Sequence, residues 1–266
     1  MRNYDKYLQA LPTPVCYLPE YDCYLKEEYT LPSGSHKDRE TVNLLLKQDN
    51  RDCLCVTTGN AGISLAYYMG EKAHIVVPVT CSSKKVILLR QYGAQVIMHG
   101  KTYLEAWNEG RRIAEANDWW NISPGIEQSR HIGDAAITKE IPYASFIFVP
   151  AANHTLAYGI AMGRSESSRT KVVSVVLPNH PFLNLTDEEI EGYESIATTN
   201  GQFQEYLEKR WLGLENTAIE TVSRDKLKTI RKENSHGSLD YAVYLALEVS
   251  RKYNGKKVVI GTGVRR

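Results

Sequence analysis

The sequence predicts an α/β protein with mainly parallel sheets, because short apolar runs alternate with segments of helical spacing along the chain. Its 266 residues are enough for one large domain or two smaller ones. A composition of 42% hydrophobic and 24% charged residues is typical of a globular fold. The formal net charge is only +1, so electrostatics gives no reason to expect nucleic acid or a membrane surface as partner.

In the first half of the chain, each expected strand is followed by an expected helix. Ile63, Leu65 and Met69 follow a strand at helical spacing, and Gly93 ends the next helix. The expected strands here are Cys53–Val56, His74–Pro78 and Ala94–Met98, and the expected helices are Ala61–Met69, Lys84–Tyr92 and Tyr103–Asn117.

The second half repeats the alternation. We expect strands at Ser145–Val149, Val172–Val176 and Lys257–Ile260, and helices at Leu156–Met162, Phe203–Trp211 and Gly237–Tyr253. Two α/β halves that face each other would place their strand-end loops in a shared crevice, where α/β proteins bind ligands.

Five cysteines and no apolar segment after Met1 predict reduced thiols in a cytoplasmic protein. Cysteines and histidines show no tetrahedral zinc spacing, so we expect no metal. The sequence contains no apolar run of about 20 residues that would span a bilayer.

The first loop with chemical interest is Leu31–Arg39, which opens a predicted helix. Pro32 and Gly34 mark a turn, and Ser35 is placed to cap the helix. Lys37 then falls in the first turn, where the helix dipole disfavours a protonated amine. Such an amine suits imine formation, although a solvated lysine in a capped helix explains the same pattern.

A second loop, Thr57–Gly62, lies at a strand-to-helix junction. Its small residues allow backbone N–H groups to converge on an anion such as a carboxylate. Asn60 adds an amide that can donate to a phenolic oxygen. An ordinary tight turn with a helix cap explains the segment equally well.

The third loop is Val149–Leu156, again between a strand and a helix. Asn153, His154 and Thr155 could present a small anion site at the helix N-terminus. The loop contains no glycine, which makes close backbone approach to a phosphate less easy. Taken alone, this segment indicates little.

In combination and in this order, the three loops resemble the pyridoxal-phosphate enzymes of fold type II, the tryptophan synthase β-like family, and most of all threonine synthase. The similar motifs are Tyr24–Glu28 with Ser33–Arg39 (strand and cofactor lysine), Thr57–Ser64 (substrate carboxylate), and Asn121–Gly125, Arg130, Gly133, Ile137–Ile141, Ser195–Thr198 and Val258–Gly263.

The resemblance implies two α/β domains with mainly parallel, twisted sheets flanked by helices and a cofactor cleft between them. Residues 35–140 would form the N-terminal domain, and residues 1–34 with 141–266 the C-terminal, cofactor-binding domain. The cofactor would be pyridoxal 5'-phosphate, the partner a small amino-acid substrate, and the assembly a homodimer.

The resemblance also implies roles for particular residues. Lys37 would be the catalytic residue and would hold the cofactor as an internal aldimine, while Asn60 would donate to the ring hydroxyl. The expected phosphate cradle is Ala152, Asn153, His154, Thr155 and Leu156, and Thr262 would face the pyridine nitrogen. Backbone N–H groups of Thr57, Thr58, Gly59, Asn60 and Ala61 would hold the substrate carboxylate. Arg130 would contact a substrate phosphate.

Two departures of this chain from the family pattern bear on its function. The cradle lacks the family's glycines, and Glu127 stands where threonine synthase has Asn, so its charge would repel a phosphorylated substrate.

Three interpretations follow from these departures. The main one is a threonine synthase-like lyase that converts O-phosphohomoserine and water into threonine and phosphate. The alternatives are a serine/threonine dehydratase or β-replacement enzyme of the same fold, and a degenerate homologue that binds a ligand or partner without catalysis.

Overall fold

The structure is a computed structural model in which two groups of residues form compact units. It describes residues 4–47, 51–124, 126–152, 154–165, 167–177, 211, 214–235 and 237–263. Unit 1 consists mainly of Leu31–Gly133 together with the segment up to Leu11, and unit 2 of Pro12–Thr30 together with the chain from Asp134 onward. The domain boundaries expected from the sequence, at residues 35 and 141, stay a prediction.

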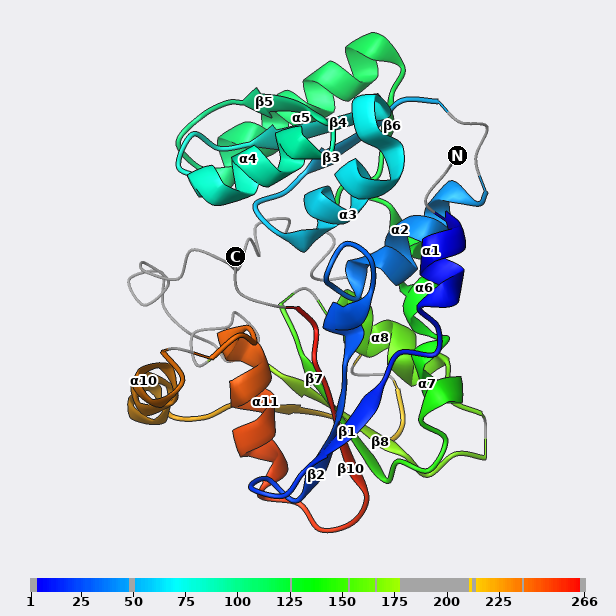
Figure 1. Cartoon of the computed structure of the whole chain (residues 1–266), viewed down its shortest axis with the longest axis vertical. Helices are drawn as coiled ribbons and strands as arrows, with labels where there is room; N and C mark the ends of the chain where they lie inside the picture. Colours follow the sequence, from blue (N-terminus) through cyan, green and yellow to red (C-terminus); the bar gives the residue numbers. More distant parts are fainter. Residues whose placement is uncertain are drawn as a thin grey trace. The chain divides into compact units, whose positions relative to one another are not determined.

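Unit 1 is built on a parallel sheet of strand order β5-β4-β3-β6 (Figure 1). Its strands are β3 (Cys53–Val56), β4 (Ala73–Val77), β5 (Gln95–Met98) and β6 (Trp120–Asn121). Its helices are α1 (Tyr4–Gln9), α2 (Lys37–Leu45), α3 (Asn60–Met69), η2 (Gly70–Lys72), α4 (Ser83–Gln91), α5 (Tyr103–Asn117) and η3 (Gln128–Arg130), and α6 (His131–Asp134) ends where unit 2 begins.

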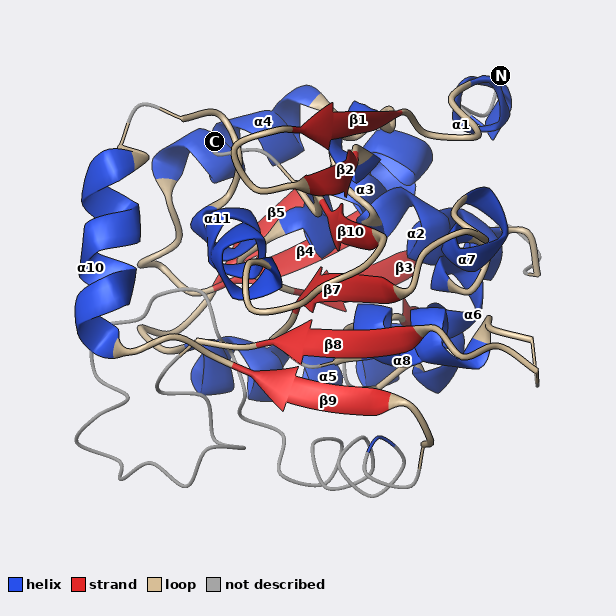
Figure 2. Ribbon diagram, turned by 90° about the horizontal axis from the view of Figure 1, so that it is seen from below, coloured by secondary structure: helices blue, strands red, loops and turns tan. Residues whose placement is uncertain are grey.

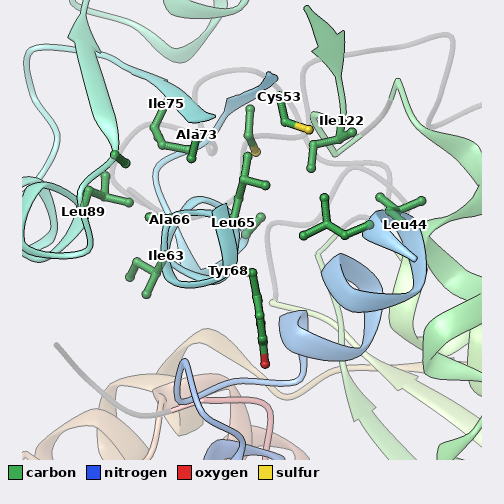
Figure 3. Packing of buried hydrophobic residues seen from close by; sticks show 14 of the residues in the cluster. Leu44, Cys53, Ile63, Leu65, Ala66, Tyr68, Ala73, Ile75, Leu89 and Ile122 are labelled. Carbon is green, nitrogen blue, oxygen red and sulfur yellow. The ribbon is translucent and has the colours of Figure 1, made fainter. Parts of the chain in front are cut away.

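The two faces of this sheet bury alternate residues of each strand, as the pleat requires. Cys53 and Ile75 pack with α2, α3 and α4 in one core, and Leu54 and Val76 pack with Trp107 of α5 in another. Figure 3 shows residues of β3 and β4 gathered around helix α3 in the first core. Both faces are therefore covered by helices, as a parallel sheet demands.

Unit 2 contains a mixed sheet of order β1-β2-β10-β7-β8-β9, seen strand by strand in Figure 2. Among the described strands, β1 and β2 pair antiparallel and the remaining pairs are parallel. The strands are β1 (Val15–Leu18), β2 (Cys23–Lys26), β7 (Phe146–Pro150), β8 (Lys171–Val175), β9 (Thr217–Glu220) and β10 (Lys257–Ile260). The helices are η1 (Glu28–Thr30), α7 (Ile137–Glu140), α8 (Thr155–Met162), α10 (Arg224–Glu233) and α11 (Tyr241–Ser250).

The same alternation forms two cores in unit 2. Val149 and Val172 pack with α8 on one face, whereas Phe148 and Val173 pack with α10 and α11 on the other. The prediction of an α/β fold with parallel sheets flanked by helices is therefore confirmed.

The expected strands and helices that fall on described residues are present, and their boundaries agree to within a residue or two except at one helix. The helix expected at Gly237–Tyr253 is shorter, Tyr241–Ser250, with Asp240 as its N-cap. Except for Trp211, the helix expected at Phe203–Trp211 lies outside the described residues, as does the motif Ser195–Thr198. All five cysteines are free thiols.

No helix within the described ranges is both long and apolar enough to cross a membrane.

Candidate functional site

The lysine expected to carry the chemistry is the first residue of helix α2. The Ser33 N–H donates to Oδ2 of the buried Asp38 over 2.8 Å, and its hydroxyl donates to Oδ1. Ser64 of α3 also donates to Oδ1 of Asp38, at 2.7 Å. These bonds fix the turn that leads into Lys37.

The prediction that Ser35 caps this helix is wrong. His36 is the N-cap, and its side chain forms no capping hydrogen bond. The buried hydroxyl of Ser35 has no hydrogen-bond partner in the described part of the chain. The helix therefore begins at Lys37, one residue later than a Ser35 cap would place it, after the turn that the hydrogen bonds to Asp38 hold.

Lys37 belongs to a buried cluster of charges that spans two segments of unit 1. Its Nζ donates to Oε1 of Glu40, one helical turn further along α2. Oε2 of Glu40 accepts a hydrogen bond of 2.6 Å from Nε of Arg130 in η3. Arg130 also donates from a terminal nitrogen to the Ile122 carbonyl at 2.6 Å. Glu40 therefore lies between two cations and contacts both.

The electrostatics of the cluster keeps Glu40 ionised. Burial alone raises the pKa of this carboxyl, but the charges of Lys37, Arg130 and His36 outweigh burial and lower the pKa to about 2. His36 contributes with Nε2 at 3.6 Å from Oε1. The carboxylate opposes the helix dipole, which by itself disfavours an ammonium at the start of α2.

The loop expected to bind a carboxylate joins β3 to α3. Gly59 is the N-cap of α3 and Asn60 its first residue. The Thr57 N–H already donates to the Val76 carbonyl at 3.1 Å, and the Gly59 N–H donates to Oγ1 of Thr57 at 3.0 Å. Nζ of Lys85 donates to the Thr58 carbonyl at 3.0 Å. The first turn of α3, including Asn60 and Ala61, begins at the carboxyl end of a parallel strand, where α/β sheets bind ligands.

The expected phosphate cradle lies in unit 2, between β7 and α8. The Ala151 N–H donates to the Val175 carbonyl, while Ala152 is exposed and Thr155 begins α8. His154 adopts φ +58°, a left-handed conformation that favours glycine, and its side chain does not cap α8. Its ring lies 5.6 Å from that of Trp211.

Two further residues of the expected cofactor site are in the same unit. Thr262 is buried and follows β10 at its carboxyl end. Leu156 is buried in the core under α8. Asn153, the remaining expected cradle residue, lies outside the described residues.

The predicted residues thus form two groups. Lys37, Arg130 and the loop Thr57–Ala61 belong to unit 1, and the cradle residues with Thr262 belong to unit 2. The loop Thr57–Ala61 follows β3, the cradle follows β7 and Thr262 follows β10, whereas Lys37 lies on α2, which precedes β3 in the chain.

The sequence analysis missed Glu40. Its spacing of three from Lys37 indicates an ion pair on one helix face, but its partner Arg130 is 90 residues away. Glu127, expected to repel a phosphate, accepts hydrogen bonds from the N–H and hydroxyl of Ser129 at 3.0 and 2.6 Å.

Comparisons with known proteins agree with the expected family. The family model described as "Pyridoxal-phosphate dependent enzyme" matches residues 7–225. The chain is 28% identical over 169 residues to the human protein "Serine dehydratase-like", covering 59% of this chain and 51% of that protein. It is 28% identical over 193 residues to "L-threonine ammonia-lyase" of Thermotoga maritima, covering 66% and 48%. The chain therefore spans about half the length of these curated relatives.

A solved structure shows the same fold. Threonine deaminase isoform 2 from Solanum lycopersicum superposes with a TM-score of 0.75 at 20% identity, covering 95% of this chain and 84% of that one.

Proposed function

The chain belongs to the family of pyridoxal-phosphate dependent enzymes of fold type II, and we propose that it is a lyase of the serine/threonine dehydratase type. In this proposal a small hydroxy amino acid loses its β-hydroxyl and yields a 2-oxo acid and ammonia. Relatives named for serine dehydration and threonine deamination support this interpretation rather than threonine synthase, which the sequence alone favoured.

The residues of unit 1 suit the cofactor by their chemistry. Lys37 supplies a primary amine that is paired with Glu40, and 15% of its side chain is exposed. Asn60 supplies an amide at the start of α3. The carboxylate of Glu40 remains ionised and accepts a hydrogen bond from Nζ, which fixes the position of the amine.

The cradle in unit 2 suits a phosphate despite its lack of glycine. The first amides of a helix have no intrahelical acceptors and attract anions. His154 takes up the left-handed conformation that a glycine would otherwise provide, and its side chain leaves the first turn of α8 uncapped. We therefore assign the phosphate to the backbone N–H groups of Thr155 and Leu156, and the ring nitrogen to the hydroxyl of Thr262.

When bound, pyridoxal phosphate supplies a ring that accepts the electron pair left when a substrate bond at Cα breaks. In this proposal Lys37 attaches the cofactor and moves the proton of Cα at its Nζ. The amide of Asn60 orients the ring, and the first turn of α3 holds the substrate carboxylate. Thr262 donates or accepts a neutral hydrogen bond, so it does not fix a proton on the ring nitrogen as a carboxylate would. Elimination of a leaving group suits such a site.

One observation carries the choice of substrate. In the threonine synthase interpretation, Arg130 would supply the guanidinium that contacts the substrate phosphate. Arg130 is buried, and it is held by Glu40 and by the Ile122 carbonyl, so Glu40 already balances its charge. This arrangement favours a substrate without a phosphate, such as serine or threonine.

The test combines cofactor loading with turnover. The wild-type chain and a Lys37→Ala variant are incubated with pyridoxal phosphate, and the visible absorption band is recorded before and after borohydride. We expect the wild type, but not Lys37→Ala, to show a visible absorption band that borohydride removes. Serine, threonine and O-phosphohomoserine are then compared by release of 2-oxo acid and of phosphate.

Oxo acid from serine or threonine supports the dehydratase. Phosphate released from O-phosphohomoserine with formation of threonine would replace it by threonine synthase. Absence of any band at saturating cofactor would leave only the non-catalytic interpretation.

A further inference from the structure

The cluster around Glu40 contains a carboxylate that the family motifs do not explain. Glu40 is completely buried, and the side chain of Arg130 is 2% exposed. Each oxygen of the carboxylate has a separate partner: Oε1 faces Lys37 and Oε2 faces Nε of Arg130. The carboxylate thus joins the candidate catalytic lysine to a buried guanidinium.

The segment that carries Arg130 is itself held against α2. A Cβ at Gly133 would lie 2.1 Å from the Arg39 carbonyl oxygen, so only glycine permits this close approach of the two backbones. Asn43 of α2 also donates to the Ser129 carbonyl at 3.5 Å. Arg130 is therefore fixed relative to Glu40 by contacts that do not depend on their charges.

Stability alone does not require such a cluster. Replacing a buried ion pair by apolar residues of similar volume is often neutral or stabilising, because desolvation offsets the attraction. The distinctive property of this cluster is that one of its members, Lys37, remains partly accessible while the other two are sealed. A partly exposed lysine that is held by a buried carboxylate is suited to control of that lysine.

We propose that Glu40 is a positioning residue that holds Nζ of Lys37 in place in the cofactor-free chain, with Arg130 fixing the carboxylate. The proposal builds on the proposed function, in which Lys37 joins the cofactor. It adds a residue that determines where the amine lies and how readily it reacts. An amine that is hydrogen-bonded to a carboxylate can attack a carbonyl only after that bond opens, so Glu40 restrains Lys37 until then.

The other groups around Glu40 do not replace it in this role. Arg130 donates to the carboxylate, and Nε2 of His36 lies 3.6 Å from its Oε1. Cys55 of β3 lies near the cluster, but burial raises the pKa of its thiol to about 12, which keeps it neutral. Among the described neighbours, Glu40 therefore provides the negative charge next to Nζ.

The experiment measures the reactivity of Lys37 without cofactor. The full chain is treated with a limiting amount of an amine-acylating reagent, and the rate of labelling at Lys37 is followed by peptide mapping and mass spectrometry. Glu40→Gln removes the charged acceptor that holds Nζ, so we expect labelling in this variant to be about tenfold faster than in the wild type. Lys85, which donates to the Thr58 carbonyl, serves as the reference within the same molecule and should not change.

A matched control comes from the exposed pair of Glu109 and Arg112, which has the same spacing of three on helix α5. Glu109→Gln should leave labelling of Lys37 unchanged. Glu40→Asp keeps the charge and should restore slow labelling in part.

The single variant leaves Arg130 without its carboxylate and is the most prone to unfold. The double variant Glu40→Gln with Arg130→Gln removes both charges, and it should show the same faster labelling of Lys37. Circular dichroism establishes which variants are folded.

Equal labelling of Lys37 in the wild type and in either folded variant that lacks the carboxylate would overturn the proposal. Labelling needs no cofactor, whereas the proposed function is judged by the absorption band and turnover. A chain that passes one test and fails the other therefore shows which of the two ideas is wrong.

Discussion

Lys26 and Lys37 each form an ion pair with a carboxylate in the interior, and the surroundings of the two lysines differ. Lys26 of β2 is fully buried and donates to Oε2 of Glu140 at 2.6 Å and to the Thr13 carbonyl at 2.5 Å. Thr13 donates in turn from its N–H to Glu140 and from its hydroxyl to Glu28, which closes the network. Lys37 of α2 keeps 15% of its side chain exposed beside Glu40.

The difference teaches how to separate a structural lysine from a reactive one. Lys26 ties the start of unit 2 to α7 and is sealed from reagents, whereas Lys37 is held by one carboxylate and can still be reached. Substitutions at the two lysines should therefore separate stability from chemistry.

The largest expected effect is on activity. Lys37→Ala should lower turnover by about 10³-fold or more, because no other group can take the place of the amine. The midpoint of urea unfolding should change little, since Glu40 keeps Arg130 as partner. Paired measurements of kcat and urea unfolding check this. Destabilisation as large as that caused by loss of Lys26 would remove the distinction between the two lysines.

The next effect is on stability. Lys26→Met should reduce the free energy of unfolding by about 3–5 kcal/mol, because it leaves Glu140 without its cation in a mostly buried position. Urea unfolding followed by circular dichroism measures the loss. An unchanged midpoint would show that the network in unit 2 contributes nothing to stability.

A smaller effect should appear as a dependence of stability on pH. The pKa of Glu40 is lowered from 4.5 to about 2 in the folded chain, so its contribution is complete above about pH 4.5 and is lost as pH falls toward 2. The wild type should lose roughly 1–3 kcal/mol of stability more than Glu40→Gln across this window. Thermal unfolding at a series of pH values checks this. If the stability of the wild type and that of Glu40→Gln changed with pH in the same way, the ion pairing of Glu40 would be contradicted.

The smallest effect is expected at the surface. Glu109→Gln removes an exposed partner of Arg112, and solvent screening leaves such pairs little to contribute. Thermal unfolding at low and high salt should give the same melting temperature as the wild type. A clear drop in the melting temperature would show that an exposed ion pair contributes to stability as the buried pairs of Lys26 and Lys37 do.

Much of the fold could be predicted because most of its strands are short apolar runs between clear helices. The strand β3 and the helix α5 lie where the pattern placed them. Strand β6 was missed because it contains only Trp120–Asn121, and β9 because its residues are all half-buried. Helix α10 was missed because only Leu227 and Ile230 are buried in a very charged segment.

The site was less predictable for a physical reason. Lys37 could be found because it lies beside turn residues in one local motif. The role of Glu40 depends on Arg130, and their contact arises only when η3 packs against α2. The conformation of His154 likewise depends on the junction of β7 and α8, where no glycine signals a left-handed residue.

The strand order of unit 2 has a consequence for how the protein folds. Strand β10, near the end of the described chain, lies between β2 and β7, so β2 cannot join the rest of its sheet until about 230 further residues have been made. Most of unit 1 is one continuous stretch, Leu31–Gly133, and can collapse around its own sheet much earlier in synthesis. We therefore expect the unit that carries Lys37 to fold first. Until β10 has been made, β2 remains unpaired on the side that later pairs with β10.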